Sequence, residues 1–156
     1  MKRFSAKALA LLLMTAVLLA ALTTAALAAP AAVNIASGSI TIGDGTYAQG
    51  SGEAAIPEGG LVITGTSDEN TIIVAPGAGK TAAFTISDLT LSTESGASLI
   101  DVQSGSAEIT LAGENALTGG GAGALIRVSD GQELTIRGEG SLTLNNGTES
   151  TAAHGA

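Results

Sequence analysis

The chain of 156 residues contains no cysteine and no tryptophan, and aromatic residues make up only 2% of it. The lack of cysteine excludes disulfides, thiolate metal ligands, a cysteine nucleophile and the acylated cysteine of a lipoprotein. Basic residues are also scarce, because six Lys and Arg stand against 14 Asp and Glu, with a formal net charge of −8. Nucleic-acid affinity is built from clustered Lys and Arg, so we expect no nucleic-acid partner.

The composition that remains is aliphatic and rich in glycine. Hydrophobic residues make up 45% of the chain and there are 22 glycines. With so few aromatic rings, any core must be built from small and branched aliphatic side chains.

Residues 1–28 have the layout of a secretory signal peptide. Lys2, Arg3 and Lys7 form a basic start, residues 8–22 are rich in Ala and Leu, and small residues lead to Ala28, where we expect cleavage. The alternative is an uncleaved membrane anchor, since the apolar stretch is just long enough to span a bilayer. After cleavage three bases remain against 14 acids, a formal charge of −11. We therefore expect an exported bacterial protein, extracellular or at the cell surface, that meets the membrane only through this segment before cleavage.

Beyond residue 38 the sequence repeats. A triplet of an apolar residue, Thr or Val, and a second apolar residue recurs, with starting positions 21, 23, 25 and 25 residues apart. The triplets are Ile40–Ile42, Leu61–Ile63, Phe84–Ile86, Ile109–Leu111 and Leu134–Ile136. Alternation of this kind is typical of β-strands whose outer residues share one face.

A second mark recurs out of phase with the triplets: a β-branched apolar residue with glycine at the third position after it. It is found at Ile56 and Gly59, Val74 and Gly77, Val102 and Gly105, and Val128 and Gly131. Glycine at positive φ allows a tight turn without a helix. Further strands are expected at residues 72–74, 89–91, 99–102, 125–128 and 142–144.

These marks predict an all-β fold, a parallel β-solenoid of about five coils of 21–25 residues, with no helix after residue 28. A short linker (residues 29–37) would precede the solenoid (residues 38–156). Stacking would place the first residues of the five triplets in one inward column and their third residues in a second column.

The succession of Ile40–Ile42 into residues 43–47, then Leu61–Gly65, then residues 84–91 resembles the opening coils of right-handed parallel β-helix proteins of the pectate-lyase-like superfamily. Residues 89–156 resemble the non-catalytic, carbohydrate-binding β-helix domains of secreted clostridial-type proteins. The resemblance implies a right-handed helix, in keeping with parallel crossovers generally, and a polysaccharide or cell-surface glycan as partner.

The last residues, 154–156, fall where another coil should begin, and no capping element is evident. A solenoid with an open last coil exposes unpaired strand edges. We therefore expect the chain to be the front portion of a longer protein, and the open coil to be a place of self-association.

Two sets of candidate ligand-binding residues follow from the predicted coils. The central threonines of four triplets would form an outward ladder suited to an ordered surface: Thr41, Thr85, Thr110 and Thr135. Acidic loop residues could supply oxygen ligands to calcium, the one cofactor considered: Asp68, Glu69, Asp88 and Asp130. The simpler alternatives are the good β-propensity of Thr and ordinary solvated surface charge.

An enzyme is not expected. Polysaccharide lyases and hydrolases need clustered carboxylates, and the aspartates here are dispersed along the chain. Aligning Leu99 with Leu125 stacks Asp101 on Arg127, and a surface ion pair is the simplest interpretation of that pair. The favoured function is non-enzymatic polysaccharide binding, assisted by calcium or not. The alternatives are a structural or adhesive stalk and the front part of a polysaccharide lyase.

Overall fold

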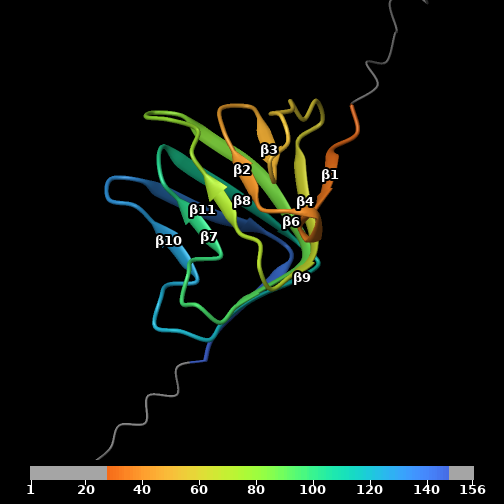
Figure 1. The fold of residues 1–156 in the computed structure, drawn as a ribbon. Coiled ribbons are helices and arrows are strands. Elements are labelled where there is room, and N and C mark those ends of the chain that lie inside the picture. Colours follow the sequence, from red (N-terminus) through yellow and green to blue (C-terminus); the bar gives the residue numbers. More distant parts are fainter. Residues whose placement is uncertain (1–27, 148–156) are drawn as a thin grey trace, which may run out of the picture.

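The computed structural model describes residues 28–147, which form a β-solenoid of about four coils (Figure 1). Within this range the secondary structure is twelve strands and one 3-10 turn, with no α-helix. The strands are β1 (Ala31–Asn34), β2 (Ile40–Ile42), β3 (Tyr47–Gln49), β4 (Leu61–Ser67), β5 (Ile72–Val74), β6 (Thr81–Thr93), β7 (Ile100–Val102), β8 (Ser106–Ala112), β9 (Glu114–Gly119), β10 (Ile126–Val128), β11 (Glu133–Gly138) and β12 (Ser141–Asn146). The all-β solenoid predicted from the repeats is confirmed, with about four coils in place of five.

The strands form two sheets, and each coil contributes to both. The larger sheet has the order β1-β4-β6-β8-β11, with β9 pairing β6 and β12 pairing β9. The smaller sheet has the order β10-β7-β5-β2-β3. All pairings between successive coils are parallel, and the one antiparallel strand pair is β2 with β3. The 3-10 turn Ile35–Ser37 links β1 to β2.

Inward side chains of the two sheets make the core. Along β6 the buried positions alternate with exposed ones, and Phe84 pairs with Ile109 while Ile86 pairs with Leu111 on the next coil. Ile63, Ile86, Ile72 and Val74 are fully buried. Burying such a side chain contributes about 1.5–3 kcal/mol, so these columns provide the main cohesion between coils.

The expected pattern of a β-branched residue with glycine three positions later is confirmed at three of its four occurrences. Val74, Val102 and Val128 stack in register on β5, β7 and β10. The glycines after them, Gly77, Gly105 and Gly131, have φ of 99°, 73° and 74°. The fourth place differs, because Ile56 is 74% exposed in a loop. Positive φ at the glycines turns the chain from the smaller sheet back into the larger one.

The two expected columns stack as predicted in their middle members and are wrong at their first and last members. Ile40 and Ile42 lie on the smaller sheet, where they pair with Ile72 and Val74 and not beneath Leu61. In the last coil Ile136 pairs with Ile109, whereas Leu134 pairs with Ala107. The shift of two residues keeps the inward face inward, so the alternation alone does not reveal it.

Asn115 is the polar exception inside the solenoid. Its side chain is 1% exposed and lies at the corner between β8 and β9. The amide oxygen accepts from the backbone N–H of Leu89 at 3.1 Å, and the amide nitrogen donates to the carbonyls of Ala112 and Ser141, both at 3.0 Å. One side chain thus joins the backbone of three successive coils at a bend where ladder bonds are interrupted.

We expect Asn115→Ala to lower the free energy of unfolding by about 2–4 kcal/mol, because it leaves the buried N–H of Leu89 and two partly buried carbonyls without this partner. The measurement is urea unfolding of the full chain followed by far-UV circular dichroism. The matched control is Asn145→Ala, since Asn145 is exposed on β12. Equal midpoints for the two variants would contradict the role assigned to Asn115.

Candidate functional site

A groove with a volume of 740 Å³ lies where three coils leave the larger sheet. Its lining comes from the ends of β6 and β9 and from the loops that follow β4, β6 and β9. The lining contains three carboxylates and five hydroxyls: Asp68, Glu69 and Glu94, with Thr71, Ser92, Thr93, Ser95 and Thr118. The ends of parallel strands meet at one edge of a sheet, and this is why groups from separate coils converge here.

The first wall of the groove is a loop held by two polar side chains, those of Ser67 and Asn70. The hydroxyl of Ser67 accepts from the backbone N–H groups of Glu69 and Asn70, at 3.3 and 3.0 Å. The side-chain amide of Asn70 donates to the carbonyl of Ile35 at 2.9 Å. These bonds fix the loop on the coil beneath it, so Asp68 and Glu69 are presented from a firmly held turn.

The second wall depends on a run of glycines. The N–H of Gly120 donates to the carbonyl of Thr93 at 2.7 Å. A Cβ at Gly121 would lie 2.6 Å from the Cα of Gly96 on the adjacent coil, closer than side-chain atoms pack. The glycine-rich stretch is therefore explained by the close approach of two loops, and Gly119 and Gly120 at its start line the groove.

An exposed hydroxyl surface continues from the groove across the larger sheet. In one outward row Thr66 pairs with Thr90, which leads to Ala116 and then Thr143. In the next row Ser92 pairs with Thr118, which pairs with Asn145. We call these two rows the hydroxyl face. Sequence reasoning missed it as a site, although the expected strands at 89–91 and 142–144 contain Thr90 and Thr143.

The expected ladder of Thr41, Thr85, Thr110 and Thr135 does not form as one row. Thr85 and Thr110 are adjacent on β6 and β8. Thr135 pairs with Glu108, while the position beside Thr110 is taken by Arg137. Thr41 lies on the other sheet and pairs with Ile73. The error comes from the same register shifts that displaced the core columns.

The four candidate calcium ligands are not brought together. Asp68 and Glu69 line the groove, and Asp130 follows β10 in the loop before β11. Asp88 sits within β6 at a φ of 51°, where its carboxylate accepts from the backbone N–H of Glu114 at 3.2 Å. Over residues 28–147 there is no group of three or more Asp, Glu, His or Cys placed to hold a metal ion.

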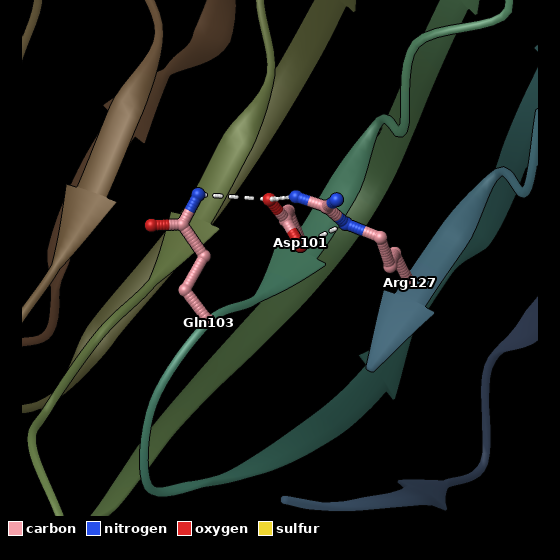
Figure 2. A network of polar contacts seen from close by, with 3 residues as sticks. All are labelled: Asp101, Gln103 and Arg127. Carbon is pink, nitrogen blue, oxygen red and sulfur yellow. Dashed lines mark hydrogen bonds and ion pairs between the residues drawn. The ribbon is translucent and has the colours of Figure 1, made fainter. Parts of the chain in front are cut away.

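The predicted stacking of Asp101 on Arg127 is confirmed (Figure 2). Arg127 donates from Nε to one carboxylate oxygen at 2.8 Å and from Nη2 to the other at 2.5 Å, and Gln103 donates at 2.8 Å. The Asp101 side chain is only 9% exposed, whereas that of Arg127 is 57% exposed. The hydrogen bond from Arg127 lowers the pKa of Asp101; burial opposes the shift and Gln103 adds to it.

Every basic side chain within residues 28–147 is paired with a carboxylate. Besides the Arg127 pair, Lys80 Nζ lies 3.3 Å from a carboxylate oxygen of Asp44, and Arg137 pairs with Glu108. No basic side chain within residues 28–147 is therefore left to neutralise the groove carboxylates. Such a surface repels polyanions.

Comparison of the chain with known protein families, with curated proteins and with solved structures finds no match. Across the part of the chain that the structure describes, no helix has the length and apolar character needed to cross a bilayer.

The Asp101–Arg127 pair predicts a defined acid response. A carboxyl whose pKa is lowered on folding contributes stability above its unfolded pKa, and this is lost as pH falls through the folded value. Arg127→Gln removes the first cause of the lowered pKa, so we expect loss of stability to begin at a higher pH than in the unaltered chain. Asp101→Asn should make the acid decline shallower.

The measurement is the urea midpoint followed from neutral pH to about pH 2, where Asp carboxylates are protonated. Asp130→Asn, at an exposed loop position, is the control for loss of a carboxylate. An unchanged acid profile in both Arg127→Gln and Asp101→Asn would show that the pair has no part in folding.

Proposed function

We propose that this chain is an exported, non-enzymatic protein that binds an uncharged polysaccharide at or near the cell surface. The observation that carries the proposal is the groove of 740 Å³ lined by carboxylates and hydroxyls from three coils. The hydroxyl face extends that site across the larger sheet.

The groove suits a repeating polar polymer for a geometric reason. Its groups recur from coil to coil at the spacing of parallel strands, about 4.8 Å. A polysaccharide offers hydroxyls at a repeating interval, and carboxylates accept hydrogen bonds from hydroxyls more strongly than neutral acceptors do. Solenoids in general use such extended surfaces for binding.

Charge favours a neutral polymer over an anionic one. The groove contains three carboxylates, and no Lys or Arg is among its lining residues. The basic residues elsewhere in residues 28–147 are held in ion pairs. An anionic polymer such as pectin would meet repulsion along the whole groove.

Calcium has no part in the proposal, because the candidate ligands are separated and no metal-binding cluster occurs within residues 28–147. No chemical step is assigned either. Asp101, the buried carboxylate outside the groove, has both oxygens hydrogen-bonded to neighbouring side chains.

The first experiment is a pull-down of the full chain on insoluble cellulose, chitin and cross-linked pectin, each with calcium and with chelator. We expect retention on a neutral polymer that is insensitive to chelator, and no retention on pectin. Asp68→Asn, Glu69→Gln and Glu94→Gln combined should reduce retention at least about tenfold, since a charge-assisted hydrogen bond contributes about 1.5–3 kcal/mol.

The matched control replaces three exposed carboxylates outside the groove, at Glu53, Glu58 and Asp130, and so changes the net charge equally. Equal retention of the two triple variants would exclude the groove as the site. Retention that disappears with chelator would show that calcium takes part in binding. Release of soluble sugar during the incubation would indicate an enzyme.

A structural stalk is the second candidate, and one observation favours it. The last coil exposes large apolar side chains: Val128 is 39%, Ile136 40% and Leu144 54% exposed. A coil of this kind is suited to join another structural unit. A folded chain that stays in solution with every polymer would favour the stalk over polysaccharide binding.

A further inference from the structure

A second cavity lies beside the groove, on the outer surface of the smaller sheet, and has a volume of 500 Å³. We call it the side pocket. Asp101 and Arg127 are the charged residues of its lining, and Ile73, Ala97 and Ala124 supply apolar side chains. Ala97 also lines the groove, as does a second shared residue, so one ligand can occupy both cavities.

The side pocket is held by strand register and by packing between loops. Ile73 on β5, Asp101 on β7 and Arg127 on β10 stack in one outward row. Gly96 and Gly123 line the pocket from two adjacent coils, and a Cβ at Gly123 would overlap the carbonyl oxygen of Gly96. The loops therefore pack backbone against backbone. The pocket is formed by the solenoid itself, as ligand sites usually are before a ligand binds.

The side pocket differs from the groove in charge. Asp101 and Arg127 balance each other, and no other charged residue within residues 28–147 is among the lining. A guanidinium has five N–H donors, of which Asp101 engages two, so three are left on a side chain that is 57% exposed. The pocket thus offers hydrogen-bond donors next to an apolar wall (Figure 2).

An acetamido group matches this combination. Its carbonyl oxygen would accept from Arg127, and a hydrogen bond from a charged donor is stronger than one between neutral groups. Its methyl group would contact the apolar side chains of Ile73 and Ala124. A hydroxyl in that place would turn a polar group toward the apolar wall, which costs free energy when no partner is present.

We propose that the side pocket binds the acetamido group of an N-acetylated, neutral polysaccharide whose sugar hydroxyls occupy the groove. This inference rests on the proposed function and narrows its substrate class. Carboxylates in the groove accept hydrogen bonds from the hydroxyls, and Arg127 donates to the acetamido carbonyl. A polymer of the chitin type is therefore preferred over one of the cellulose type.

The experiment is calorimetric titration of the full chain with tetra-N-acetylchitotetraose and with cellotetraose. The first carries an acetamido group on each sugar where the second has a hydroxyl, and both are soluble and neutral. We expect the N-acetylated tetrasaccharide to bind at least about tenfold more tightly, the ratio that one charge-assisted hydrogen bond provides. The triple groove variant described above should weaken both ligands and leave their ratio unchanged.

A charge placed in the side pocket tests the assignment to Arg127. Ala124→Glu brings a carboxylate into the pocket, where it competes for the remaining N–H donors, and should abolish the preference. Ala122→Glu is the matched control, because Ala122 is exposed on the same loop and lines neither cavity. Arg127→Lys keeps the charge beside Asp101 but loses the planar donor fork, and should reduce the preference.

The outcomes separate this inference from the proposed function. Equal affinity for the two tetrasaccharides would overturn the inference and leave the proposed function standing, as would an unchanged preference in Ala124→Glu. Failure of the N-acetylated tetrasaccharide to bind would overturn it as well. If the full chain is also not retained on any polymer, both the inference and the proposed function are wrong.

Discussion

Parallel backbone pairing between successive coils is the interaction on which the rest of the structure depends. Each residue on one coil has a fixed partner on the next, so a side chain's neighbours are set by register and not by closeness in sequence. Inward positions must then be apolar in every coil. The stacked pairs Ile63–Ile86 and Phe84–Ile109 meet this requirement. The corner at Asn115 shows the complementary need, because backbone groups at a bend still require partners.

The same constraint accounts for the position of the candidate site. Strands of one sheet end at one edge, so the loops after β4, β6 and β9 converge although they lie far apart in the chain. Glycine allows the loops on neighbouring coils to approach closely, as Gly121 and Gly96 do. Polar groups then recur at the interval of the coils, and that periodicity is the property a polymer would recognise.

Charge and edges give the molecule two surfaces of different character. Basic side chains form ion pairs within the solenoid, as Arg127 does with Asp101. The surface around the groove is therefore acidic and rich in hydroxyls. Within residues 28–147 the last coil is apolar at Ile136 and Leu144, and its strands pair on one side only. The polar groove and the exposed apolar side chains thus come from separate parts of the chain.

The sequence alone determined most of the strands and their faces, because period-two alternation needs only local order. It located β5, β7 and β10 together with the glycines that follow them, and it matched Asp101 with Arg127. It did not reveal strand β9 or the hydroxyl face, since Ala116 interrupts the row of threonines. The groove was also missed, because its carboxylates come from loops without any shared pattern.

Only the tertiary structure decided register and sheet membership. The loop between β10 and β11 is longer by one residue than the loop between β7 and β8, so Ile136 and not Leu134 stacks on Ile109. Ile40 joins the smaller sheet for a similar reason, because the hairpin at β3 lengthens the first coil. Alternation is unchanged by a shift of two residues. The sequence therefore specifies which side chains face inward, and loop lengths together with packing between coils decide which of them meet.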